Sequence, residues 1–277
     1  MKNYLKLVNF EVNRVVKLFV VLLGITFVVQ IAGVILQARK YLNAANQQIY
    51  QEMVTQAEFI EMTGQLSFLH VGRSLWFLGP IAICVAGVGF YIFLIWYRDW
   101  VGKNTFIYRL LMLPTTRLNV FYAKMTTILV MTFGLVAFQL IFLPIEMMIL
   151  KGMVPSEFLK EMGFIEVVNS VPRLSMIIPN NLLQLILSYG AGLLVVSILF
   201  TGILLERSFK WKGIFAAILF GSAAVFVFIS PFLLQDFVLD GFFYPIELFV
   251  IEIVLALVLL AASVWLSGFL LKKKITV

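Results

Sequence analysis

Long uninterrupted runs of apolar residues are the feature that most constrains the fold of this chain. Six such runs can be drawn, each near the length of about twenty residues that lets an α-helix cross the hydrocarbon layer of a bilayer. No water satisfies the backbone in that layer, so each run must form a helix that makes its own hydrogen bonds. The sequence therefore predicts an all-α integral membrane protein with six transmembrane spans at 18–36, 75–96, 125–150, 182–205, 214–234 and 246–271.

The composition is that of a chain solvated by lipid. Hydrophobic residues make up 62% of the 277 residues and charged residues only 13%, whereas soluble domains carry about 25% charged residues. The segments between the spans are too short to form a separate catalytic domain. We therefore expect one transmembrane domain over residues 1–277.

Basic residues are distributed unevenly between the two sides of the predicted spans. Most of the 21 Lys and Arg residues lie before the first span, between the second and third, between the fourth and fifth, or after the sixth. Basic loops are retained on the cytoplasmic side, so both termini are expected in the cytoplasm and the segments 38–74 and 151–181 outside. The net charge of +7 then reports topology rather than nucleic-acid binding. We expect a multi-pass protein of the cell (cytoplasmic) membrane.

The segments outside the spans carry weaker signals. Residues 1–17 have an amphipathic pattern, which predicts an interfacial helix that turns into the first span; a straight extension of that span is the alternative. Residues 38–74 resemble a helical continuation of the first span that is broken near Thr63 and Gly64. After the third span, Ser156 can cap a short helix.

The segment 98–124, between the second and third spans, contains a short amphipathic helix. Asn104 or Thr105 can cap this helix, and Pro114 can end it. Arg109 lies on one flank and apolar side chains lie on the other. A helix of this kind at the inner membrane face can fit a hydrophobic groove on a cytoplasmic partner and transmit its motion to both neighbouring spans. The apolar flank consists of Phe106, Ile107, Leu110 and Leu111.

One run in this segment resembles a known family. It consists of Gly102, Thr105, Leu110–Leu111, Leu113–Pro114, Arg117 and Lys124, followed at once by a long apolar span. The run is similar to the connection between the second and third helices of ABC-2 type permeases, where this segment is the coupling helix that docks on the ATP-hydrolysing subunit. Family members often have a glutamate after the threonine and a small residue after the proline, where this chain has Phe106 and Thr115. The coupling residues implied by the resemblance are Thr105, Phe106, Ile107, Arg109, Leu110, Leu111, Leu113, Pro114 and Arg117.

The source of energy can be examined in the sequence. A phosphate-binding loop needs GxxxxGK followed by Ser or Thr, but Gly102–Lys103 is followed by Asn104, and Tyr97 stands where the first glycine should be. We therefore expect no cofactor on this chain, with ATP and Mg²⁺ bound by a partner.

The resemblance implies two cytoplasmic ABC ATPase subunits as partners. It also implies a second permease subunit, as a homodimer or a related heterodimer. The exported cargo would be an amphipathic or lipidic compound such as a peptide antibiotic, a lipid or a drug. Membrane lipid is a further expected partner, and nucleic acid is not.

Polar residues in or beside the spans are candidate contacts for the cargo. Three glutamates reach the outer boundary, where they are either solvated or serve as an external gate or a contact for a cationic substrate. Three glutamines lie deeper, where a side-chain amide needs a partner; we expect interhelical hydrogen bonds, with substrate contact as the alternative. These residues are Glu146, Glu247 and Glu252, and Gln30, Gln139 and Gln184.

Enzyme and metal chemistry are not expected of this chain. Cys84 is the one cysteine and lies in an apolar run, and His70 is the one histidine, so these residues cannot form a metal-binding cluster. No Gly-x-Ser-x-Gly nucleophile motif occurs either. The alternative to a permease is a membrane scaffold or sensor that does not transport and whose cytoplasmic helix recruits a partner.

Overall fold

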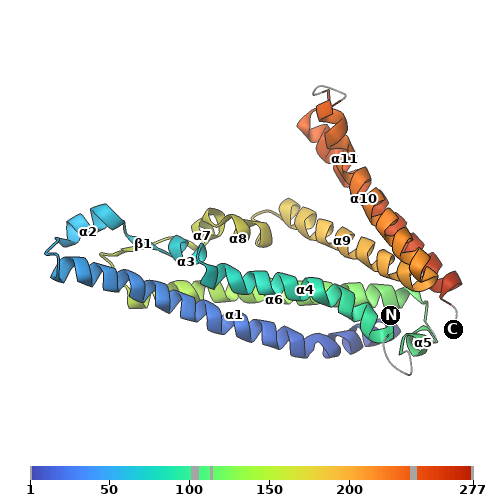
Figure 1. Ribbon diagram of the computed structural model, residues 1–277, viewed down its shortest axis with the longest axis horizontal. Helices are drawn as coiled ribbons and strands as arrows, with labels where there is room; N and C mark the ends of the chain where they lie inside the picture. Colours follow the sequence, from blue (N-terminus) through green and yellow to red (C-terminus); the bar gives the residue numbers. More distant parts are fainter. Residues whose placement is uncertain (1, 101–105, 113–114, 238–241, 276–277) are drawn as a thin grey trace. The chain divides into compact units, whose positions relative to one another are not determined.

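The computed structural model describes residues 2–100, 106–112, 115–237 and 242–275 (Figure 1). Within these residues, six helices are long and apolar enough to cross a membrane, consistent with a mostly helical, multi-pass membrane protein. They are α1 (Lys2–Tyr50), α4 (Leu75–Trp100), α6 (Leu118–Met153), α9 (Leu182–Phe209), α10 (Trp211–Phe237) and α11 (Pro245–Phe269).

Large apolar side chains remain exposed on these helices. In α10, for example, Phe215 is 73% exposed and Leu219 is 71% exposed. Apolar surface of this extent is unfavourable in water but not in hydrocarbon. The exposed faces therefore agree with a lipid environment.

The first five predicted spans each lie within one long helix, and the sixth covers most of α11 and ends in the short π-helix that follows it, η1 (Leu270–Lys274). The helices extend beyond the predicted spans because helical hydrogen bonding does not stop where the apolar run ends. The predicted turn between residues 1–17 and the first span is wrong: α1 continues without a break, as the alternative of a straight extension expects. No proline interrupts α1 in this region.

The connecting segments fold into short elements. These are α2 (Gln56–Thr63), α3 (Phe68–Gly72), α5 (Phe106–Leu111), α7 (Phe164–Ser170), α8 (Pro172–Ile177) and the strands β1 (Leu66–Ser67) and β2 (Leu159–Lys160).

Two of these segments differ from the sequence predictions. The helix break near Gly64 agrees with the prediction, since α2 ends there with a φ of 78°, but an earlier break after Tyr50 was not predicted. The short helix expected from Ser156 is absent. The backbone at Leu159 pairs instead with Leu66 in the parallel β1–β2 ladder, so its hydrogen bonds run across to another segment rather than along a helix.

The chain divides into two compact units, although the sequence led us to expect one domain. Unit 1 consists of Met1–Arg14, Gly89–Leu129 and Ile186–Val277. Unit 2 consists of Val15–Val88 and Val130–Leu185. The helices α1, α4, α6 and α9 each contribute residues to both units.

Unit 2 has a core in which the short elements pack on the long helices. Val34 and Ala38 of α1, Phe77 of α4 and Leu143 of α6 are almost completely buried in it. The same core continues through α2, α3, α7 and α8. The connections at this end of α1 are therefore packed structure rather than open loops.

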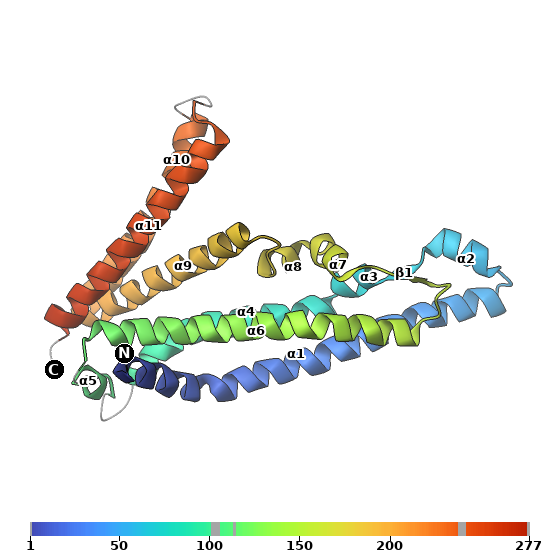
Figure 2. The ribbon, with the colours of Figure 1, turned by 180° about the vertical axis from the view of Figure 1, so that it is seen from behind.

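Unit 1 is held by aromatic and hydroxyl contacts between helices. The Phe200 ring of α9 packs edge to face against Trp96 and Phe121, with centroids 5.4 and 5.5 Å away. The Thr201 hydroxyl lies 3.1 Å from the Ser263 carbonyl oxygen of α11, to which it donates. In both ribbon views α10 and α11 run side by side (Figures 1 and 2).

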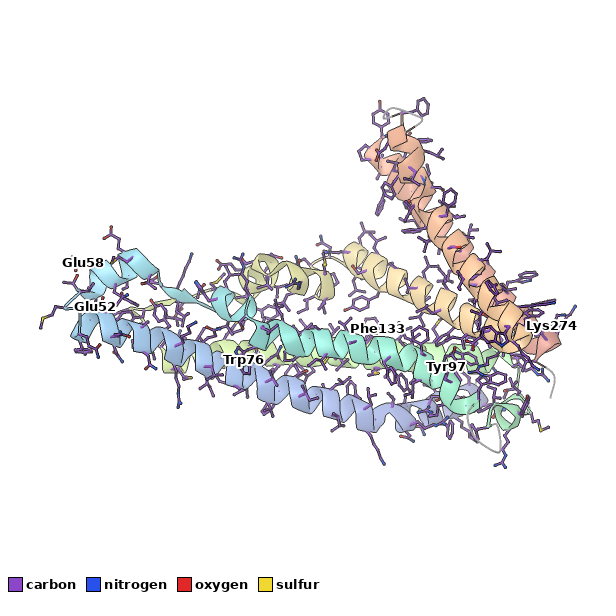
Figure 3. All side chains as sticks on the ribbon, in the orientation of Figure 1. Glu52, Glu58, Trp76, Tyr97, Phe133 and Lys274 are labelled. Carbon is purple, nitrogen blue, oxygen red and sulfur yellow. The ribbon has the colours of Figure 1, made fainter. Side chains whose placement is uncertain are left out.

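Helices α1 and α4 lie close together in unit 2 at Gly33. A Cβ atom added at Gly33 would lie 2.5 Å from the Trp76 Cβ atom, a distance that needs the backbones to separate. Trp76 lies near the start of α4, where this helix runs beside α1 (Figure 3). Gly24, on the same helix, has no atom within 4 Å of such a Cβ position.

These two glycines form a matched test of the packing. We expect Gly33→Ala to destabilise the protein by about 1–3 kcal/mol because it overpacks the contact with Trp76. Gly24→Ala should be neutral or stabilising by about 0.5–1 kcal/mol, because alanine favours a helix. Thermal unfolding of both variants in detergent measures the difference, and equal melting temperatures would contradict the close approach.

Candidate functional site

The short helix α5 rests on two long helices through its apolar side. Ile107 is completely buried, and Leu110 and Leu111 are 4% and 5% exposed. Leu110 packs in a small core with Leu7 of α1 and with Val120 and Ala123 of α6. Both ribbon views show α5 beside the N-terminal end of α1 (Figures 1 and 2).

The opposite side of α5 is open. Arg109 is exposed, Tyr108 is 36% exposed, and Met112, directly after the helix, is 71% exposed. The predicted separation of Arg109 from an apolar flank is therefore present. Three of the predicted coupling residues, Thr105, Leu113 and Pro114, lie outside the described residues.

A cluster of charged side chains lies where α1, α4 and α6 meet in unit 1. It consists of Glu11 and Arg14 of α1, Arg98 and Asp99 of α4, and Lys124 of α6. Glu11 is 2% exposed, and Asp99 and Lys124 are completely buried. We refer to these five residues as the charge cluster.

The ammonium group of Lys124 uses all three of its protons within the charge cluster. Nζ donates to Glu11 Oε1 and to the Ile95 carbonyl oxygen, both at 2.8 Å. It also donates to the Asp99 carboxylate, and it lies 5.2 Å from the centre of the Trp96 ring. A buried charge is tolerated only with such complete pairing.

Arg14 connects the charge cluster to α5. Its Nη1 donates to Asp99 Oδ1 at 2.8 Å, and its guanidinium carbon lies 5.4 Å from the centre of the Phe106 ring. Phe106 also stacks on Phe10, with ring centroids 5.6 Å apart. A continuous set of contacts thus leads from α5 through Arg14 and Asp99 to Lys124.

A hydrogen bond and a cation–π contact in unit 1 join α4 to α9. The Tyr97 hydroxyl donates to the Glu206 carboxylate, and the Arg207 guanidinium carbon lies 4.6 Å from the centre of the Tyr97 ring. Tyr97 lies near the end of α4 (Figure 3). This end of α4 is therefore bound to α9 as well as to α1 and α6, which it meets in the charge cluster.

Arg117, predicted as a coupling residue, makes a contact within the chain. Its Nη1 donates to the carbonyl oxygens of Leu271 at 2.7 Å and Ile275 at 2.9 Å. Carbonyls at the end of a helix have no partner within it. Arg117 therefore stabilises η1 at the last described residues of the chain.

Sequence reasoning did not select Glu11, Arg14 or Asp99 as site residues. A signal was present, because both acidic residues stand alone among basic ones: Glu11 is the one acidic residue in the first 51, and Asp99 is the one between Glu61 and Glu146. Asp and Glu are almost never buried unless they are paired, so a lone carboxylate among basic residues is a candidate for an ion pair.

All three glutamines predicted in the spans make hydrogen bonds between helices, although Gln184 does so at the N-terminal end of α9. Gln30 Nε2 of α1 donates to Gln139 Oε1 of α6 and to the Phe77 carbonyl oxygen of α4, both at 3.2 Å. Gln184 lies only three residues into α9 rather than deep in it, and its Nε2 donates to the Ser175 carbonyl oxygen at 3.4 Å.

The three glutamates lie in different environments. Glu247 is exposed, and its Oε2 accepts a hydrogen bond of 2.9 Å from the Tyr244 amide at the first turn of α11. Glu146 is completely buried, so in this conformation it does not face the outside as a gate would. Among the described residues, neither carboxyl oxygen of Glu146 or of Glu252 has a hydrogen-bond partner.

The chain matches no protein-family model, no characterised protein and no solved structure in the three comparisons made.

Removal of the Lys124 charge tests the charge cluster. We expect Lys124→Met to destabilise the protein by about 3–5 kcal/mol, because it removes the buried cation that binds both Glu11 and Asp99 and leaves these buried carboxylates with only partly exposed arginine partners. The control is Lys151→Met, since Lys151 pairs with Glu161 where both side chains are about two-thirds exposed (66% and 65%), and such a pair contributes less than about 1 kcal/mol.

The double variant Lys124→Met/Asp99→Asn should recover part of this loss, because it removes one charge of each sign. Thermal unfolding in detergent measures all three variants. Equal losses for Lys124→Met and Lys151→Met would contradict the assigned role of the charge cluster.

Replacing Glu146 should not lower the stability of the protein, in contrast to replacing Lys124. A buried carboxylate without a partner opposes folding, so Glu146→Gln should leave the melting temperature unchanged or raise it. A clear decrease would show that the carboxyl group has a stabilising partner, and it would remove the basis for regarding its oxygens as unpaired.

Proposed function

We propose that this chain is the membrane subunit of an ABC-2 type exporter that is driven by a separate cytoplasmic ATPase. One observation carries the proposal: a short helix between two long apolar helices, α5, is fixed to the chain on one side and open on the other. This arrangement suits a contact that must receive force from a partner and pass it on to the helices.

The contacts of α5 support a role in transmission. Its apolar side packs on α1 and α6 through Leu110, and Phe106 touches Arg14 of the charge cluster. The charge cluster joins the ends of α1, α4 and α6. A displacement of α5 would therefore move these three helix ends together rather than bend one connection.

The geometry changes which residues we assign to the docking contact. The resemblance implies Ile107, Leu110 and Leu111, but these side chains are buried within the chain. In the proposed complex the ATPase instead meets the exposed side chains of Tyr108, Arg109 and Met112. Aromatic, arginine and methionine side chains are enriched at protein interfaces.

The remaining parts of the proposal follow from the sequence. The phosphate-binding loop motif does not occur in this chain, so ATP and Mg²⁺ belong to the partner. In the proposal α5 and both termini lie in the cytoplasm and the protein lies in the cell membrane, an orientation that the distribution of basic residues supports. A second permease subunit and an amphipathic or lipidic cargo complete the proposed exporter.

The docking surface can be tested with a matched pair of double variants. Arg109→Glu/Met112→Asp changes the open side of α5, whereas Arg39→Glu/Met53→Asp makes the same substitutions at exposed positions of unit 2. Affinity-tagged protein is extracted from native membranes in mild detergent, and the ATP hydrolysis that co-purifies with it is measured.

We expect at least about a tenfold loss of co-purified ATPase activity for the α5 variant, equivalent to the loss of one strong interface contact, and little change for the control. The proposal is wrong if the unmodified chain brings down no ATPase. It is also wrong if both variants retain the activity equally.

A further inference from the structure

Five lysines and an exposed tryptophan gather at one end of unit 1. Lys210 forms the turn between α9 and α10, Trp211 and Lys212 begin α10, and Lys272, Lys273 and Lys274 belong to η1. All five lysines are exposed, and Trp211 is 80% exposed. We call these six residues the lysine–tryptophan patch.

The lysines of η1 are held on an anchored segment. Leu270, Leu271 and Ile275 are 1%, 0% and 4% exposed, so the apolar residues on either side of the lysines are buried. Arg117 binds carbonyl oxygens of this same segment. The three ammonium groups therefore project from fixed backbone (Lys274 in Figure 3).

The turn between α9 and α10 is equally well defined. Lys210 adopts a φ of 53°, the left-handed conformation that closes a tight connection. A contact across the patch joins its two halves: Lys274 Nζ lies 5.6 Å from the centre of the ring of Phe209, the residue before Lys210. Residues more than sixty positions apart in sequence thus form one surface.

This surface carries positive charge that the described part of the chain does not neutralise. None of the five lysines pairs with a described acidic residue. The acidic residue nearest to the turn in sequence, Glu206, already accepts from Tyr97 and lies beside Arg207. The patch therefore keeps a positive charge that no described carboxylate compensates.

The tryptophans indicate where an anion bound to this patch would lie. The patch is at the ends of three long apolar helices, and Trp211 stands at the start of α10. Trp265 of α11 is also 72% exposed. Indole rings concentrate at the level of the lipid headgroups, the depth at which phosphate groups meet ammonium groups.

We propose that the lysine–tryptophan patch binds the headgroup of an anionic phospholipid. The phosphate accepts hydrogen bonds from lysines of the turn and of η1, and the Trp211 ring lies against the glycerol region. Clusters of four to eight basic residues beside a membrane helix bind anionic lipid in this way. The proposal depends on the chain spanning a membrane and is independent of the proposed transport function.

The test uses the full chain in lipid nanodiscs and follows the quenching of its tryptophan fluorescence. Nanodiscs of phosphatidylcholine receive increasing fractions of either brominated phosphatidylglycerol or brominated phosphatidylcholine. A Trp211→Phe/Trp265→Phe variant gives the quenching that comes from the other tryptophans. For the unmodified chain, we expect the anionic lipid to reach half-maximal quenching at a fraction at least about fivefold lower than the neutral lipid does.

Two five-residue variants provide the comparison. Replacing all five patch lysines by glutamine should abolish the preference for the anionic lipid, and replacing them by arginine should keep it. The control replaces five exposed basic residues elsewhere in the chain by glutamine and should also keep it. These control positions are Arg39, Lys40, Lys151, Lys160 and Arg173.

Three kinds of result in the quenching experiment would overturn the proposal. The first is equal quenching of the unmodified chain by the two lipids. The second is a preference that survives in the glutamine variant of the patch or that is lost equally in the control. The third is complete loss of the preference in inorganic phosphate but not in sodium chloride of the same ionic strength, which would identify a site for free phosphate.

The same glutamine variant separates lipid binding from the binding of a protein partner. Intact lipid preference together with a loss of co-purified ATPase would assign the patch to the partner instead and would overturn the lipid proposal. A loss of lipid preference with the ATPase retained supports it.

Discussion

The end of unit 1 that carries α5 depends on how one ammonium group is satisfied. Lys124 has lost all contact with water, and its partners come from two other helices: Glu11 from α1, and Ile95 and Asp99 from α4. Hydrogen bonds to a buried charge require a definite direction, whereas apolar contacts do not. The charge cluster therefore fixes the register of three helix ends that apolar packing alone would leave free to slide.

The contacts of α5 show which of two roles its apolar residues have. Such residues either enter a groove on a partner or hold the helix to its own chain. Leu110 has the second role, because it packs with Leu7 and Val120. The proposed recognition of a partner then falls to polar and adaptable side chains such as Arg109 and Met112, and its strength depends on the shape of that partner.

The helices could be predicted from the periodicity and length of the apolar runs. The packing between segments far apart in the sequence could not. The six apolar runs and the short helix at Phe106–Leu111 follow from local patterns. The continuity of α1 was only the alternative prediction, because an amphipathic pattern fits both a helix at a membrane surface and one that packs on its own chain. The association of Glu11 with Lys124 joins residues 113 positions apart, a relation that no local window contains.

The β1–β2 ladder shows the same limit on a smaller scale. Ser156 has the chemistry of a helix cap, yet the next residues pair with Leu66, more than ninety positions earlier. A capping residue permits a helix but does not require one, since the backbone only needs its hydrogen bonds satisfied.

The 49 residues of α1 have a mechanical consequence. At about 1.5 Å per residue the helix is about 70 Å long, whereas the hydrocarbon layer is about 30 Å thick. Even a tilted α1 therefore extends well beyond the layer. Ala38, Tyr41 and Ala45, near its far end, pack with the core of unit 2, so this projecting part is braced rather than free. A protease or an antibody that approaches this end from the water would meet a helix packed on one side and still exposed on the other, for example at Tyr50, which is 78% exposed.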